Sequence, residues 1–181
     1  MNLVLIKHGK TDYSLNGKRQ GRTDLSLNLE GKKEITELKE KIKKDYKLCF
    51  SSPLKRTYET AVILFPEMKV IKNDLLIEYD FGELEGIPFS MPFENFPDNK
   101  IKEFNDMKFL MPNNGETFED IVDRCINFLE FIKGNFQAQD NVAAVTHSTN
   151  IEIFKALANE LPWYKYLGDS RNFQGFIELN I

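Results

Sequence analysis

The residues best suited to chemistry are the chain's only two histidines, and each directly follows a short apolar segment. His8 stands in LVLIKHGK, directly after Lys7, and His147 stands in NVAAVTH. A third apolar segment, KLCF, is followed by two serines and, a few residues later, by Arg56. Imidazole can act as a nucleophile or exchange protons, and the arginine fork matches the oxygens of phosphate. These residue types together point to chemistry on an anionic group, for which phosphate is the natural candidate.

The three apolar segments are predicted to be buried strands, which would position these side chains. Residues 2–6, 47–50 and 141–146 form short, continuous apolar runs, typical of strands covered on both faces. Further short strands are expected at 68–71 and 173–180. In an open parallel sheet, ligands bind outside the carboxyl ends of the strands. We therefore expect His8, His147 and Arg56 to meet at one edge of the sheet.

Segments with helical periodicity alternate with these strands. We expect helices at 29–45, at 116–136, at 149–160, and after KLCF, where Ser52 would be the N-cap and Pro53 the first helical residue. Arg56 would then lie in a first turn, where the helix dipole disfavours a cation unless an anion binds beside it. The alternation predicts an α/β fold, a three-layer α/β/α sandwich with a mostly parallel central sheet.

Two segments lack such periodicity. Residues 9–28, rich in Gly, Asn, Asp and Ser, are expected to form a loop. Residues 85–114 contain four of the seven prolines and are expected to be irregular. Within them, 87–114 hold five phenylalanines and three methionines, which predict either an apolar lid over a substrate or a satellite hydrophobic cluster.

Composition narrows the class of protein. The 181 residues, 41% of them hydrophobic, suggest a single domain over 1–181. A net charge of −4 argues against nucleic acid as a partner. The N-terminus has no basic region before its short apolar run, and no apolar stretch is long enough for a bilayer, so we expect a cytoplasmic protein without membrane contacts. Cys49 and Cys125 are expected to be reduced core thiols.

Two other chemistries fit the sequence less well than phosphate binding. The two histidines and two cysteines do not show the spacing of a zinc site, so no metal site is expected. The sequence also lacks a glycine-rich P-loop, so nucleoside triphosphate chemistry is not indicated.

Five segments resemble, in order, the motifs of the histidine phosphatase superfamily, the phosphoglycerate mutase-like proteins. They run from residue 3 to 148, and are IKHGKTDYSLNGKRQGRTDLSLNLEGKKE, SSPLKRTYETA, LIEYDFGELEG, NNGETFEDIVDR and VAAVTHS. The resemblance implies the phosphoglycerate mutase-like form of the sandwich. It also implies phosphoryl transfer through a phosphohistidine, without a metal or other cofactor.

The resemblance assigns roles to individual residues. His8 would be the nucleophile, while Arg56, His147 and Lys7 would hold the phosphoryl oxygens. Glu78 would be the general acid and then the base toward water. Burial would raise the pKa of Glu78 and the nearby cations would lower it, and the sequence leaves the balance open. The expected substrate-binding residues are Lys7, Ser14, Gln20, Gly21, Arg56, His147 and Ser148.

Some of these positions depart from the family pattern. Lys7 replaces an arginine and so keeps the charge without the bidentate fork. Ser14 stands where many members have asparagine, and Ser148 replaces a glycine. Asp80, Glu83 and Glu85 are near neighbours of Glu78 and so are rivals for the acid's role.

Three functions are compatible with these residues. The favoured one is a phosphomonoesterase acting on a small-molecule phosphate ester, as a monomer or homodimer. A phosphoglycerate mutase would make the same first half-reaction but return the phosphate to a sugar acid. A pseudo-phosphatase would bind phosphoesters without turnover, and Lys7 is the main support for that reading.

Overall fold

A five-stranded sheet forms the centre of the molecule in the computed structural model, which describes residues 1–42, 45–98, 101–104, 107–166 and 175–181. The strand order is β3-β2-β6-β1-β7. The strands are β1 (Asn2–Lys7), β2 (Leu48–Ser51), β3 (Val70–Lys72), β6 (Asn141–Thr146) and β7 (Phe176–Asn180). All neighbours pair in parallel except β7, which is antiparallel to β1. The predicted mostly parallel sheet is confirmed.

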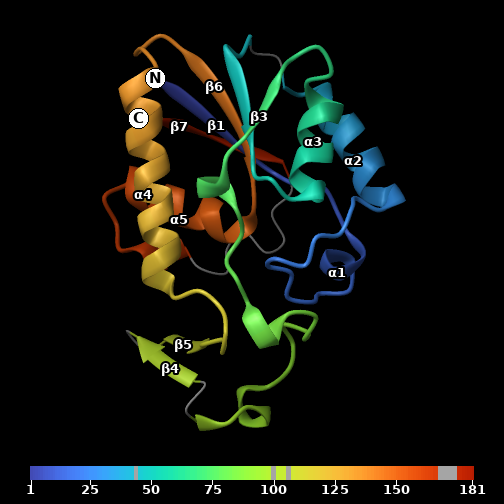
Figure 1. Ribbon diagram of the computed structural model, residues 1–181, viewed down its shortest axis with the longest axis vertical. Helices are drawn as coiled ribbons and strands as arrows, with labels where there is room; N and C mark the ends of the chain where they lie inside the picture. The colour runs from blue at the N-terminus through green and yellow to red at the C-terminus, as the bar shows by residue number, and fades with distance from the viewer. Residues whose placement is uncertain (43–44, 99–100, 105–106, 167–174) are drawn as a thin grey trace.

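Helices cover both faces of this sheet. Helices α2 (Leu29–Lys39) and α3 (Lys55–Leu64) lie on one side, and α4 (Phe118–Asn135) and α5 (Ser148–Ala158) on the other (Figure 1). A short helix, α1 (Asp12–Leu15), follows β1. The predicted three-layer α/β/α architecture is therefore confirmed.

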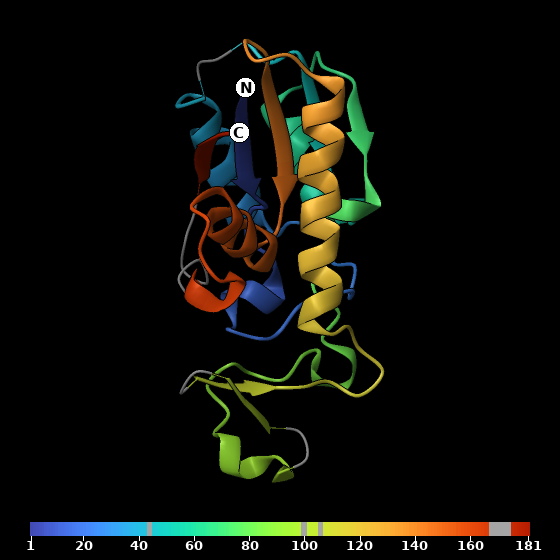
Figure 2. The ribbon, with the colours of Figure 1, turned by 90° about the vertical axis from the view of Figure 1, so that its left-hand side faces the viewer.

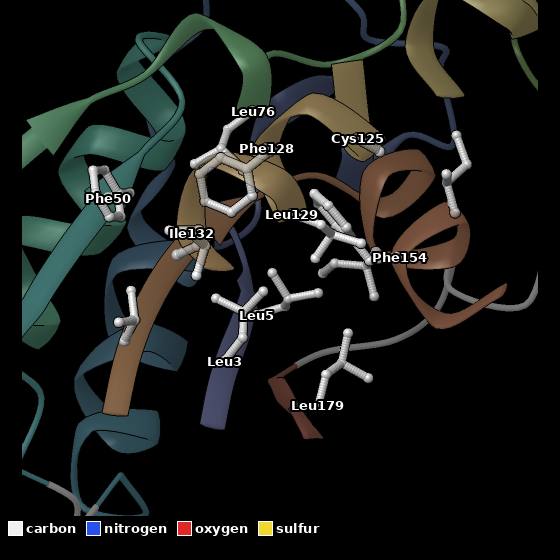
Figure 3. Packing of buried hydrophobic residues seen from close by; sticks show 14 of the residues in the cluster. Leu3, Leu5, Phe50, Leu76, Cys125, Phe128, Leu129, Ile132, Phe154 and Leu179 are labelled. Carbon is white, nitrogen blue, oxygen red and sulfur yellow. The ribbon is translucent and has the colours of Figure 1, made fainter. Parts of the chain in front are cut away.

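Strand β1 shows why the sequence folds in this way. Leu3 and Leu5 belong to the core beneath α4 and α5, whereas Val4 and Ile6 belong to the core beneath α2 and α3, and all four are fully buried. Figure 3 shows the first of these cores, with the rings and branched side chains of α4 and α5 packed over β1. Because helices cover both faces of the sheet, side chains on both sides of the strand are apolar, and the sequence of the strand is an unbroken apolar run.

The two cysteines lie in different layers. Cys49 is in the core under α2 and α3, and Cys125 is in the core under α4 and α5, so the sheet separates them. Burial raises the pKa of the Cys49 thiol to about 12. Both are free and buried, as expected for core thiols.

Helix α3 begins later than the sequence predicts. Its N-cap is Leu54, and Ser52 lies outside the helix with Pro53. The Ser52 hydroxyl is engaged by His147, which is distant in sequence. A prediction from local capping preferences could not include that contact, so the proposed N-cap at Ser52 was wrong.

The boundaries of other elements differ less from those predicted from the sequence. Helix α2 ends at Lys39 rather than near residue 45, and 43–44 lie outside the described residues. In the expected loop 9–28, a capping box between Thr11 and Ser14 forms α1. Strand β3 is shifted by two residues at its start, and β7 begins at Phe176, while 173–174 lie outside the described residues.

The segment 85–114 contains more regular structure than expected. It forms an antiparallel hairpin of β4 (Ile101–Phe104) and β5 (Met107–Leu110), and a 3-10 turn at Phe93–Asn95. Further 3-10 turns occur at Asp74–Leu76, Gly82–Leu84 and Trp163–Tyr166. Figure 2 shows the hairpin segment beyond the end of the sandwich toward which the arrowheads of β1 and β6 point. The segment therefore lies at the edge where the predicted site should be.

None of the helices in the described part of the chain is both long and apolar enough to cross a membrane.

The core can be tested with two phenylalanines of helix α4. Phe128 is fully buried and packs edge-on against Phe50, whereas Phe131 also contacts Phe50 but is 38% exposed. We expect Phe128→Ala to lower the free energy of unfolding by about 3–5 kcal/mol, because it leaves a cavity. Phe131→Ala should lower the free energy of unfolding clearly less, because its side chain is already partly exposed. Equal losses in denaturant titrations of the two variants would contradict this view of the core.

Candidate active site

The pairing of strands β1 and β6 brings the two histidines together. Lys7 is paired with Thr146, and the His8 backbone N–H donates to the Thr146 carbonyl at 3.1 Å. The next residue of each strand is therefore a histidine at the same sheet edge. The two imidazole rings lie 5.2 Å apart between centroids, at 63° to each other. The convergence expected from the sequence is present.

The hydrogen bonds of His8 define its tautomer. Its Nδ1 lies 2.7 Å from the Gly9 carbonyl oxygen, which can only accept, so Nδ1 carries the proton. Nε2 therefore carries the lone pair, and it accepts from Arg56 Nε at 3.3 Å. Burial, together with the charge of Arg56, holds the pKa of His8 well below its ordinary value. The ring is thus a neutral imidazole with Nε2 as its basic nitrogen.

Arg56 is fully buried in the first turn of α3 and is held by backbone carbonyls of the 20–23 loop. Its Nη1 donates to Thr23 O at 3.0 Å, and its Nη2 donates to Gly21 O at 2.7 Å. Burial lowers the pKa of Arg56 to about 10, which still leaves the group charged at neutral pH. The carbonyls orient the guanidinium without neutralising it, so the site keeps a fixed positive charge beside His8.

His147 has one occupied and one unoccupied ring nitrogen. Its Nε2 lies 2.9 Å from Ser52 Oγ, and its buried Nδ1 has no hydrogen-bond partner among the described residues. Buried polar atoms are nearly always paired, so this nitrogen is suited to a polar atom of a ligand. Burial is the main cause that holds the pKa of His147 well below its ordinary value, with Arg56 adding to it.

Glu78 is buried and also lines the cavity that His8 lines, and its carboxylate accepts from the Tyr79 backbone N–H at 2.8 Å. Burial raises the pKa of Glu78, and the Tyr79 hydrogen bond and the Arg56 charge oppose that effect without overcoming it. The balance that the sequence left open therefore favours a raised pKa.

Three residues hold the backbone just before Glu78. Arg124 Nη1 donates to Ile77 O at 2.8 Å, Asn150 Nδ2 donates to the same oxygen at 3.0 Å, and Thr146 Oγ1 donates to Leu76 O at 2.8 Å. Strand β6 and helices α4 and α5 thus all contribute to placing this carboxylate.

A cavity of about 660 Å³ opens over these groups. Among its lining residues, six were expected from the sequence, namely Lys7, His8, Ser14, Gln20, Glu78 and Ser148. The others of the expected set, Arg56, His147 and Gly21, lie behind this lining, where Arg56 and His147 are fully buried. The lining also contains six aromatic side chains, here called the aromatic wall, which are Tyr79, Phe81, Phe89, Phe93, Phe109 and Phe118.

Local hydrogen bonds and close packing hold three other expected residues, Gln20, Ser14 and Gly21, in place. Gln20 accepts from the Thr11 hydroxyl, and the Ser14 hydroxyl donates to Thr11 O at 3.0 Å within the capping box. Gly21 packs so closely that an added Cβ would come within 2.3 Å of Tyr79 O. Its carbonyl also orients Arg56, so Gly21 acts on the site through its backbone.

Several lining residues were missed from the sequence. Thr149 and Glu152 share the cavity face of α5 with Ser148, and Lys18 and Arg19 line the mouth beside Gln20. The helical spacing of 148 and 152 would have placed both on one face. The role of Ser52 as the partner of His147 had no local signal, because the two residues are far apart in sequence.

Within the described part of the chain, no group of three His, Cys, Asp or Glu residues is arranged to hold a metal ion.

A family model, described as the histidine phosphatase superfamily (branch 1), matches residues 3–168 of the chain. The chain belongs to this superfamily. The resemblance drawn from five sequence segments is thereby confirmed, and with it the phosphoglycerate mutase-like fold. The structure of the α-ribazole phosphatase from Shigella flexneri superposes with a TM-score of 0.80, over 100% of this chain and 91% of that chain, at 23% identity.

Two relatives show the extent of the match to this histidine phosphatase-like chain. An uncharacterized phosphatase, PhoE, of Bacillus subtilis is 33% identical over 154 residues, which are 82% of this chain and 72% of PhoE. A metal-independent phosphoserine phosphatase of Arabidopsis thaliana is 30% identical over 151 residues, which are 80% of this chain and 63% of that protein. The relatives named as phosphatases thus agree with the family.

The protonation of the site can be measured directly, because the chain has only two imidazoles. At about pH 6, below the ordinary histidine pKa near 6.5, we expect both rings to remain neutral, since a lowered pKa means that protons bind only in more acidic solution. Nitrogen NMR of imidazole-labelled protein should also show the His8 proton on Nδ1. Two rings titrating near pH 6.5 would contradict the described environment.

Proposed function

We propose that this protein is a metal-independent phosphomonoesterase that hydrolyses a small-molecule phosphate ester through a phosphohistidine on His8. The observation that carries the proposal is the His8 ring, which lines the cavity as a neutral imidazole, with Nδ1 bonded to the Gly9 carbonyl and Nε2 beside the Arg56 guanidinium. The Arabidopsis relative, which is named a metal-independent phosphoserine phosphatase, supports the same reaction class.

In the first half-reaction, His8 Nε2 attacks the phosphorus and the bond from phosphorus to the ester oxygen breaks. Glu78 gives its proton to that departing oxygen, so the leaving group departs as an alcohol. A raised pKa suits this role, because it keeps the carboxyl protonated at higher pH. In the second half-reaction, Glu78 takes a proton from water, the water oxygen attacks phosphorus, and the phosphorus–nitrogen bond breaks to restore His8.

Positive charge stabilises the transferring group. Arg56 supplies a buried guanidinium, and Ser148 begins helix α5, whose N-terminus favours an anion. His147 Nδ1 is a buried polar atom that has no partner in the described part of the chain. Lys7 adds an ammonium, although burial lowers its pKa against the opposing effect of nearby carboxylates. These groups would hold the phosphoryl oxygens, with Gln20 and Ser14 farther toward the mouth.

The aromatic wall favours an apolar or aromatic leaving group. Phe89 lies on the segment 87–114 and is tied to the site, since its N–H donates to Gly17 O at 2.9 Å and the Arg19 guanidinium stacks on its ring at 4.8 Å. We propose that 87–114 acts as a substrate lid within the single domain 1–181. Phe104 and Met107, which belong to the expected apolar set, have side chains outside the described residues.

The nucleophile is tested with His8→Ala and an activated aryl phosphate. The wild-type protein should release phosphate at an undiminished rate in EDTA, and His8→Ala should show no turnover above background, because the attacking atom is gone. Mass spectrometry at neutral or alkaline pH should detect one added phosphoryl group on wild-type His8. Activity that survives in His8→Ala, or that EDTA abolishes, would contradict the phosphohistidine mechanism.

The same assay separates the two other functions. Transfer of the phosphoryl group to an added glycerate acceptor would indicate a mutase. Binding of vanadate without any release of phosphate would indicate a pseudo-phosphatase.

The general acid is tested by the leaving group that it must protonate. Glu78→Gln should lower kcat/KM about 100-fold or more for an alkyl phosphate, whose alkoxide needs a proton, and much less for a nitrophenyl phosphate. Glu83→Gln is the matched control, since Glu83 is exposed and outside the cavity lining. Equal losses on both substrates, or the same pattern in Glu83→Gln, would contradict the assignment.

A further inference from the structure

The carboxylate of Glu85 binds the loop that holds Arg56, and Glu85 lies outside the described lining of the cavity. One carboxylate oxygen accepts from the Arg22 N–H, and the other accepts from the Thr23 N–H at 2.7 Å and from the Thr23 hydroxyl. The sequence makes Glu85 a rival of Glu78 for the role of the acid, but these contacts direct its side chain to the loop. Its position therefore calls for a different role.

The peptide group between Gly21 and Arg22 links Glu85 to Arg56. Its N–H donates to Glu85, and its carbonyl oxygen accepts from Arg56 Nη2 at 2.7 Å. Because the N–H and C=O of a trans peptide point in opposite directions, the carboxylate and the guanidinium lie on opposite sides of this group. Hydrogen bonds at both ends of one peptide polarise it in the same sense, so each strengthens the other. Thr23 makes a second link, since its N–H donates to Glu85 and its carbonyl accepts from Arg56 Nη1 at 3.0 Å.

The backbone fixes where this carboxylate lies. Gly21 leaves room for it, because an added Cβ there would come within 2.7 Å of Glu85 Oε1. The chain around Glu85 is also bonded to the chain before the loop, since the Gly86 N–H donates to Arg19 O at 2.8 Å and the Arg19 N–H donates to Ile87 O at 3.0 Å. The fold therefore places Glu85 and the loop in a defined register.

We propose that Glu85 is a positioning residue for Arg56, because its carboxylate holds the loop peptides whose carbonyls orient the guanidinium beside His8. The inference rests on the proposed function, in which Arg56 stabilises the transferring phosphoryl group. A carbonyl can hold a buried cation in one orientation only while the peptide itself is held, and a carboxylate that accepts from backbone N–H groups does so with charge-assisted hydrogen bonds.

Binding of orthovanadate, a stand-in for phosphate, tests the proposal without requiring turnover. Glu85→Gln keeps the length of the side chain, but its amide nitrogen is a donor and cannot accept from the N–H that it would face. Loss of one contact should let the loop and Arg56 shift. We expect the Kd for orthovanadate in calorimetric titrations to rise about tenfold or more, since small misplacements of a group in a site have effects of this size.

The protonation of His8 distinguishes a displaced Arg56 from a simple change in charge. The charge of Arg56 lowers the pKa of His8, so moving the guanidinium away should raise that pKa, by about one pH unit. Loss of the negative charge of Glu85 alone would act in the opposite direction. Nitrogen NMR of imidazole-labelled protein measures the midpoint of His8 protonation in the wild type and in Glu85→Gln.

Glu59→Gln is the matched control. Glu59 lies on the same helix as Arg56, and its carboxylate accepts from the Leu27 N–H at 3.0 Å, which belongs to a peptide outside the 20–23 loop. The variant thus also removes a carboxylate that holds a loop N–H, but not one that holds a carbonyl partner of Arg56. Its Kd for orthovanadate and its His8 midpoint should stay close to the wild-type values.

Glu85→Asp separates the position of the carboxylate from its charge. It keeps the charge but is one methylene shorter, so it cannot reach both N–H groups from the same backbone position. It should weaken orthovanadate binding and raise the pKa of His8 in the same directions as Glu85→Gln, and it decides the question if Glu85→Gln does not fold.

The outcomes separate the two proposals. An unchanged Kd and an unchanged His8 midpoint in Glu85→Gln, wild-type behaviour of Glu85→Asp, or equal changes in Glu59→Gln would overturn the role of Glu85. A protein that shows the expected changes, while its wild type releases no phosphate from any ester, would instead overturn the proposed function.

Discussion

A fully buried guanidinium is the constraint on which the rest of the site depends. Arg56 reaches the site from α3, and is oriented by carbonyl oxygens of the 20–23 loop and by His8 Nε2. A buried charge is tolerated only where its donors are satisfied, so this loop must fold back over the end of β1. The close packing of Gly21 against Tyr79 is part of the same requirement. One cation therefore connects a helix, a strand end and a loop that are remote in sequence.

The desolvation that makes the charge of Arg56 costly to bury also shifts the pKa values of its neighbours. The same burial lowers the pKa of both imidazoles and raises the pKa of Glu78. A neutral imidazole and a carboxyl with a raised pKa suit the phosphoryl transfer to His8 that we propose. Burial is the main cause in all three cases, and the Arg56 charge adds to its effect at the two imidazoles and opposes it at Glu78.

Much of this could be predicted from the sequence, because the deciding signals are local. Apolar runs covered on both faces identify the strands, and a histidine after each of two runs predicts their meeting at one edge. What could not be predicted depends on distant contacts. Ser52 is bonded to His147 instead of capping α3. The hairpin in 85–114 has little alternation of apolar and polar residues that would have predicted its strands. The direction of the pKa shift of Glu78 depends on how deeply the fold buries it. Glu152 was missed although its helical spacing from Ser148 was available.

The separation between the hairpin segment and the sandwich has a consequence for how such a protein can diverge. The two histidines and Arg56 are held by the sheet, by α3 and by a loop beneath them, whereas the aromatic wall comes largely from 79–118. Insertions or deletions within the hairpin segment would leave the ladder between β1 and β6 untouched. Selection can therefore change the residues of the hairpin segment while the two histidines and Arg56 keep their places at the edge of the sheet.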